Sequence, residues 1–225
     1  MIPYKLVRSR RKTVAIYITN DAAVEIRAPL KMPKSDIEKV IASKEKWIEK
    51  SLGLREQINA EKSEFTLNYG DMVMLAGNMY QIKIKDGKRA GFNGECFYLP
   101  PNLAPNEIKG AVVQIYKAVA KRIIHNKVSE YAKCMNITLA AIKITSAKTR
   151  WGSCSGKNSI NFSWRLVMAD DDVIDYVVVH ELAHIREHNH SPRFWKVVQE
   201  ILPDYKDRQS KLKTLQKKLS IQNWD

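Results

Sequence analysis

The segment Val177-Val-Val-His-Glu-Leu-Ala-His-Ile-Arg-Glu-His-Asn-His190 carries the pattern H-E-x-x-H inside an apolar run that suits a helix. On an α-helix, residues four apart lie about 40° apart around the axis and ~6 Å along it. His180 and His184 therefore point the same way and can share one metal ion. Glu181 is one position further round, close enough to reach a water on that ion without binding the ion. Two neutral nitrogen ligands, an open coordination position and a nearby carboxylate are what a zinc hydrolase needs.

A third protein ligand is expected after this helix ends. His188 follows His180 by two helical turns, which on an unbroken helix is ~12 Å along the axis and too far to share the ion. Asn189 is suited to end the helix, because Asn tolerates the left-handed conformation at a helix terminus. His190 follows at once and can fold back, so we predict His180, His184 and His190 as the metal ligands. Two acidic residues further along the chain are the alternatives for the third ligand: Glu200 and Asp204.

These residues predict a zinc-dependent hydrolase. We expect a metallopeptidase that cleaves peptide bonds through a zinc-activated water, with Glu181 as the general base. The oxyanion needs a further donor, and three residues near the motif are candidates: His188, Arg193 and Tyr205. Two other functions stay open, a zinc hydrolase acting on another amide and a basic nucleic-acid-binding module with a structural zinc. The second is disfavoured because structural zinc sites usually have four protein ligands, often Cys.

Length and cysteine usage set the broad class. With 225 residues, the chain is long enough for one large domain or two small ones. No stretch approaches the ~20 apolar residues that a membrane helix requires, so we expect neither a signal peptide nor a membrane span. The three cysteines show no C-x-x-C spacing, which favours free thiols in a reducing compartment. The expected location is cytoplasmic.

The chain is strongly basic, with a formal net charge of +14. The first twelve residues contain no acid, and residues 205–219 contain six basic residues against Asp207 alone. Such a balance attracts polyanions, so weak nucleic-acid binding without sequence preference is one prediction. A basic surface that only keeps the protein soluble is the alternative, and the lack of a known nucleic-acid-binding motif favours it.

The N-terminal half is expected to begin with strands. Residues 4–26 alternate in the strand manner. A helix is predicted from Ser35, with Trp47 on its buried side and Gly53 beyond its end. The polar stretch 55–64 then resembles a linker.

Residues 65–99 are expected to form short strands separated by turns, in a small β-rich unit that the N-terminal strands complete. We therefore predict an N-terminal β-rich part with one helix over residues 1–100. A long helix follows from Pro105 to about Met135, with an apolar stripe along one side.

The C-terminal half is expected to contain a sheet and three further helices. Residues 141–168 return to strand character, and the acids at 170–172 mark the start of the H-E-x-x-H helix, where the helix dipole favours negative charge. Ser191-Pro192 is suited to cap and begin the next helix. The predicted fold class is α+β, with residues 101–225 as the catalytic domain.

A resemblance extends along almost the whole chain. Its motifs are Arg8-Ser-Arg-Arg-Lys-Thr13, Trp47-Ile48, Arg150-Trp-Gly-Ser-Cys-Ser155, His180-Glu-Leu-Ala-His184 and Asn189-His-Ser-Pro-Arg-Phe-Trp195. With these motifs the chain resembles the YgjP-like metal-dependent hydrolases, a family of zinc metallopeptidases, and more distantly the SprT-like proteases. The resemblance implies a zincin-like catalytic domain, His180, His184 and His190 as zinc ligands, and Glu181 as the catalytic residue. It does not define a substrate.

The histidine spacing also equals that of the metzincins. Their turn glycine is Glu187 here, however, and no methionine follows Met168 to form a Met-turn. We therefore reject a metzincin assignment.

The segment from Arg150 to Trp164 is expected to form a hairpin. In zincins an edge strand beside the active-site helix pairs with the extended substrate, since main-chain bonds hold a peptide of any sequence. Gly152 would permit a close backbone approach there. Trp151, Trp164 and Cys154 are equally compatible with packing roles and with lining the substrate, and Cys154 is not expected to be a nucleophile.

Overall fold

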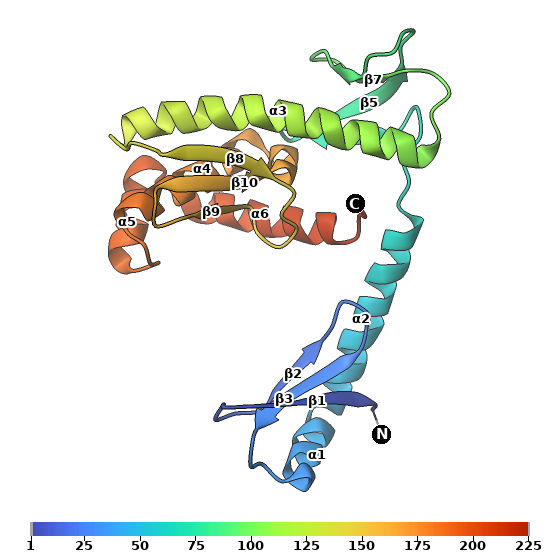
Figure 1. The fold of residues 1–225 in the computed structure, drawn as a ribbon, viewed down its shortest axis with the longest axis vertical. Coiled ribbons are helices and arrows are strands. Elements are labelled where there is room, and N and C mark those ends of the chain that lie inside the picture. The colour runs from blue at the N-terminus through green and yellow to red at the C-terminus, as the bar shows by residue number, and fades with distance from the viewer. Residues whose placement is uncertain (1, 225) are drawn as a thin grey trace. The chain divides into compact units, whose positions relative to one another are not determined.

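The computed structural model describes residues 2–224, apart from the side chains of residues 63 and 64. The chain divides into two compact units (Figure 1). The first contains the chain up to Phe65 together with Leu219–Asn223, and the second contains Thr66–Lys218 with Trp224. Both units mix helices and strands, which confirms the predicted α+β class. Among the described residues, none of the helices combines the length and the hydropathy that crossing a membrane would require.

The first unit is a three-stranded sheet with two helices. Strand β3 (Val24–Pro29) lies in the centre, parallel to β1 (Tyr4–Ser9) and antiparallel to β2 (Ala15–Ile18). The helices are α1 (Lys34–Ser43) and α2 (Glu45–Glu64). Isoleucines of the sheet and of both helices form a separate hydrophobic core. The N-terminal strands therefore make their own sheet, and the prediction that they complete the 65–99 unit is wrong.

Two details of α2 differ from the sequence prediction. Gly53 lies inside the helix, which continues through the supposed linker 55–64. One glycine costs a helix only about 1 kcal/mol relative to alanine, and the residues that follow it are good helix formers. Trp47 is 50% exposed, whereas its neighbour Ile48 is fully buried. Adjacent helical residues lie about 100° apart, so only one of the two can face this core.

The second unit begins with a four-stranded sheet packed on a long helix. The strands are β4 (Met72–Leu75), β5 (Asn78–Ile84), β6 (Gly91–Phe92) and β7 (Phe97–Leu99), in the order β4-β5-β7-β6. The predicted long helix is present as α3 (Pro105–Cys134).

Aromatic contacts connect this sheet with α3. The rings of Phe97 and Tyr116 lie 5.3 Å apart, and the Tyr116 hydroxyl donates a hydrogen bond to the Met74 carbonyl. Residues 66–100 therefore group with the rest of the second unit, whereas the sequence analysis placed the division after residue 100.

A second sheet of this unit has the order β8-β10-β9. Strand β10 (Ser159–Ser163) is parallel to β8 (Ala141–Thr145) and antiparallel to β9 (Gly152–Cys154), so the predicted hairpin is confirmed. Figure 1 shows β8 beside α3 and β9 at the opposite edge. A short 3-10 helix, η1 (Trp164–Met168), leads from β10 toward the H-E-x-x-H helix.

Three helices complete the second unit. The H-E-x-x-H helix is α4 (Asp171–Arg186), and it contacts β9 on the sheet edge. The two predicted C-terminal helices are α5 (Pro192–Ile201) and α6 (Tyr205–Ser220). Ser191 caps α5 as expected, because its side chain accepts a hydrogen bond from the Phe194 N–H.

Candidate metal centre

Helix α4 supplies the first part of the centre. Asp171 and Asp172 occupy its first turn, where negative charge is favourable. Asp170 is the N-cap residue, but its side chain makes no cap hydrogen bond. The helix ends at Arg186 and not at Asn189, whose backbone is not left-handed. Instead, the Asn189 side chain accepts the N–H of Ser191, which fixes the turn that follows the helix.

The structure brings the three predicted histidines together. One ring nitrogen of each of His180, His184 and His190 lies within 4.8 Å of the others. The Nε2 atoms of His180 and His190 are 3.1 Å apart. Zinc–nitrogen bonds of about 2.0–2.1 Å in a tetrahedron place two ligand nitrogens about 3.3 Å apart, so this cluster fits one such ion. Asp204 is not in the cluster and pairs with Arg208 instead.

Burial favours the neutral, metal-binding form of the two imidazoles on α4, His180 and His184. It lowers the pKa of His180 to about 3, and electrostatic interactions with the two neighbouring histidines lower it further. Burial also lowers the pKa of His184. The Nδ1 atom of His184 lies 3.2 Å from the carbonyl oxygen of Glu187, which can only accept a hydrogen bond. Nδ1 must therefore carry the proton, and Nε2 of His184 is free to bind a cation.

The side chain of Glu181 extends from α4 to the edge strand β9. Its side chain is only 6% exposed, and burial raises its pKa to about 7, against the opposing charge of Arg150. A Cβ atom at Gly152 would come within 2.6 Å of the Glu181 carboxyl oxygen Oε1. The Glu181 side chain therefore packs directly on the backbone of β9, and the close approach of a substrate backbone at Gly152 stays a prediction. This carboxyl can exist in either protonation state near neutral pH.

Arg150 and Cys154 both interact electrostatically with Glu181. Arg150 is exposed and acts electrostatically on Glu181, which the sequence analysis did not anticipate. Burial and the negative charge of Glu181 both raise the pKa of Cys154. The thiol of Cys154 therefore stays protonated at neutral pH, in agreement with the expectation that it is not a nucleophile.

Aromatic rings surround the histidines. The fully buried Phe194 lies 4.5–4.9 Å, centroid to centroid, from all three of them. Tyr176, one turn before His180 on α4, makes an edge contact with the His180 ring at 5.8 Å. The sequence did not reveal these roles of Tyr176 and Phe194, although Phe194 follows His190 by only four residues. Tyr205, an oxyanion candidate, stacks on Trp195.

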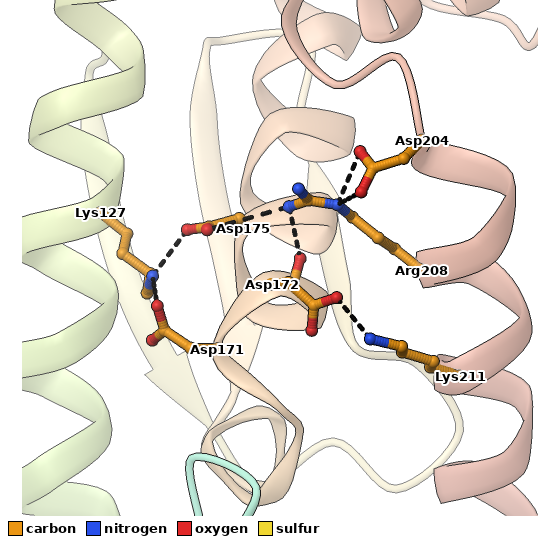
Figure 2. Close-up of polar contacts among 7 residues, drawn as sticks. All are labelled: Lys127, Asp171, Asp172, Asp175, Asp204, Arg208 and Lys211. Carbon is orange, nitrogen blue, oxygen red and sulfur yellow. Dashed lines mark hydrogen bonds and ion pairs between the residues drawn. The ribbon is translucent and has the colours of Figure 1, made fainter.

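An ion-pair network holds α4 between α3 and α6 (Figure 2). Asp175 of α4 contacts Lys127 of α3 at 2.7 Å and Arg208 of α6 at 3.9 Å. Arg208 also donates to the Asp172 carbonyl at 2.9 Å. The side chains of Lys127, Asp175 and Arg208 are all at least four-fifths buried, so solvent screens them weakly. Further ion pairs of the network join Lys127 to Asp171, Arg208 to Asp204, and Lys211 to Asp172.

A histidine cluster beside a buried glutamate, on a helix next to an open sheet edge, is the arrangement of a metal-dependent hydrolase. The chain matches the family model of the YgjP-like metallopeptidase domain over residues 12–215. It therefore belongs to this family, which confirms the resemblance and identifies the chain as a metallopeptidase-type enzyme.

Two solved structures are similar to part of the chain. One is the metallopeptidase zymogen of Pyrococcus abyssi abylysin, with 19% identity and a TM-score of 0.39 over 44% of this chain and 97% of that chain. The other is the metallopeptidase zymogen of Methanocaldococcus jannaschii jannalysin, with 25% identity and a TM-score of 0.37 over 42% and 95%. Both TM-scores are low, and the family match alone identifies the chain. A search of curated proteins gave no significant match.

Proposed function

We propose that this protein is a zinc-dependent peptidase in which His180, His184 and His190 bind the ion and Glu181 is the general base. The observation that carries the proposal is the convergence of ring nitrogens from His180, His184 and His190 on one point, with the buried carboxyl of Glu181 beside them. The donor set of three nitrogens suits zinc with one coordination position left open.

Each residue has a distinct part in this reaction. The three histidines would hold a zinc ion, which would lower the pKa of a bound water to about 7 and polarise the substrate carbonyl. Glu181 would accept a proton as the water attacks and return it to the leaving amine. Strand β9 is a sheet edge, so its free main-chain groups can pair with an extended peptide alongside Glu181.

The position of edge strand β9 beside Glu181 favours a peptidase over a zinc hydrolase that acts on small amides. An amidohydrolase for small molecules has no need of a strand edge beside the general base, whereas a peptidase does. A structural zinc is disfavoured because, in the described part of the chain, the cluster offers three histidines without a fourth Cys, Asp or Glu ligand.

The test combines metal analysis with cleavage of an unfolded protein. Wild type should contain about one zinc per chain, and a chelator should abolish cleavage that added zinc restores. Glu181→Gln should keep the zinc and lose about 10²–10⁴-fold in rate, because the amide cannot act as a base. His190→Ala should lose zinc, and His188→Ala, in the same exposed turn, is its control. Undiminished cleavage by Glu181→Gln would contradict the mechanism.

Binding to nucleic acid stays a prediction. On α6, Arg208 and Lys211 form ion pairs with acids of α4 or of the preceding turn, so they contribute little to a phosphate-binding surface. Lys206 and Lys213 are exposed. The cytoplasmic location also stays a prediction.

A further inference from the structure

His190 is held differently from the other two histidines of the centre. His180 and His184 lie on α4, which is packed on both sides, whereas His190 lies in the exposed turn before α5. Among the described residues, the one hydrogen-bond contact of its ring joins Nε2 to Nε2 of His180. These two nitrogens would have to face the same cation, so this contact cannot orient the ring once a metal is bound. Something else must orient His190.

The ring of Trp195 is in position to do so. It stacks on His190 with a centroid distance of 5.7 Å and an interplanar angle of 24°. The Trp195 ring also stacks on Tyr205, at 5.2 Å and 17°, and it meets Phe194 edge-on at 5.1 Å. Three near-parallel rings, from His190 through Trp195 to Tyr205, therefore form one column. Tyr205 is 9% exposed, so the column ends on a buried side chain.

Further contacts connect this column of rings to His180. Tyr205 is the first residue of α6, and on the next turn of α6 the Gln209 amide donates to the Tyr176 hydroxyl at 3.3 Å. Tyr176 in turn contacts the ring of His180. The contacts thus connect His190 to His180 through residues of α5, α6 and α4. A chain of contacts of this kind fixes the distance between a ligand in a turn and a ligand on a helix.

We propose that Trp195 is a positioning residue that holds His190 in its metal-binding orientation, and that the Trp195–Tyr205 stack sets the affinity of the centre for its metal ion. The proposal rests on the proposed metal centre, but it does not depend on any peptidase activity. A ligand that is oriented before the metal arrives loses less conformational freedom on binding, and groups that orient ligands typically contribute about 10–100-fold in metal affinity.

Phe194 cannot replace Trp195 in this role. Phe194 is fully buried and contacts all three histidines, so it packs against the whole cluster and does not orient His190 alone. Trp195 makes its near-parallel contact with His190, and meets His180 by its edge at 5.9 Å. Removing the Trp195 ring should therefore release His190 and leave the two helical histidines in place.

The experiment measures the zinc dissociation constant of the full chain by competition with a chromophoric chelator. Trp195→Ala should bind zinc about 10–100-fold more weakly than wild type. Trp195→Phe keeps a planar ring and should restore affinity to within about threefold of wild type. Trp47→Ala is the matched control, because it removes a half-exposed tryptophan of the other unit, and it should not change the affinity.

A second readout reports the ligand geometry directly. The visible spectrum of the cobalt-substituted protein depends on the number and arrangement of ligands, so the Trp195→Ala spectrum should shift toward that of His190→Ala. If Trp195→Ala does not fold by circular dichroism, Tyr205→Leu tests the same column from its buried end and should weaken zinc binding in the same direction.

The outcomes separate this proposal from the proposed function. Equal zinc affinity and equal cobalt spectra in wild type and Trp195→Ala would overturn the positioning role and leave the metal centre standing. An equal loss in Trp195→Phe and Trp195→Ala would also overturn it, because ring stacking would then not be the cause. Failure of wild type itself to bind zinc would refute both proposals.

Discussion

The contact between Gly152 and Glu181 makes a quantitative prediction for Gly152→Ala. The new Cβ would lie 2.6 Å from both Cγ and Oε1 of Glu181 and 2.7 Å from its Cδ. Carbon atoms in favourable contact lie about 3.5–4.0 Å apart, so the two side chains overlap by about 1 Å. Glu181 is buried and has little room to move. Overpacking of this kind typically costs about 1–3 kcal/mol in the free energy of unfolding.

Backbone effects cannot account for such a loss. Gly152 is not among the residues with positive φ, so alanine can adopt its conformation without strain. Alanine also loses less conformational entropy than glycine on folding, which by itself would stabilise the protein slightly. Any destabilisation must therefore come from the overlap with Glu181.

A double-mutant cycle isolates this overlap. Glu181→Ala removes all three atoms that the new methyl group would meet, so in that background Gly152→Ala should be neutral or slightly stabilising. Urea unfolding of the four metal-free proteins should then give a coupling energy of about 1–3 kcal/mol. An equal cost of Gly152→Ala in both backgrounds would refute the claim that Glu181 packs on the strand. Gly152→Ala should also impair cleavage, because Glu181 can move aside only by leaving the base position.

Three further predictions concern the rest of the second unit. Burial raises the pKa of the Glu181 carboxyl, so metal-free wild type should lose stability as that group ionises between pH 4.5 and about 7. Glu181→Gln does not ionise and should gain stability relative to wild type over this range, by up to about 3 kcal/mol. Urea titrations below and above this pH range measure the difference, and a difference that does not change with pH would contradict the prediction. Arg208→Ala should lower the free energy of unfolding by about 1–3 kcal/mol, because it removes hydrogen bonds to charged and carbonyl groups, whereas the exposed control Lys213→Ala should change it by less than about 0.5 kcal/mol. If the protein binds DNA through phosphates, the logarithm of its affinity should fall linearly with the logarithm of the salt concentration, with a slope of about 0.9 per neutralised phosphate. Charge reversal at Lys206 and Lys213 should make this slope shallower. A lack of binding at low salt would leave the net charge as a solubility feature.

The histidine cluster could be predicted because the sequence features that specify it lie within a few residues of one another. The spacing of His180 and His184 follows from one helical turn, and the position of His190 follows from the need to reverse the chain within a few residues. The orientation of His190 was not predictable, since it depends on Tyr205, whose position depends on how α6 packs on α4.

Each difference between the predicted and the observed fold depends on contacts or on a balance of energies that the local sequence pattern does not show. Helix α2 continues past Gly53 because a single weak helix former does not end a helix. The exposure of Trp47 depends on which of two neighbouring apolar residues meets the core, and periodicity alone does not decide this. Strands β1 to β3 pair with one another, a choice that depends on contacts between distant residues and has no signature within each strand.

The order of helices along the chain sets the order in which the charged partners of α4 are synthesised. Asp172 and Asp175 of α4 meet Lys211 and Arg208 of α6, which are made later, while Lys127 of α3 is made earlier. A polypeptide emerges from the ribosome N-terminus first, so α4 appears with one of its two charged neighbours and without Tyr205 to support the turn at His190. The histidines of a nascent chain are therefore present before the geometry that would make them a tight metal site.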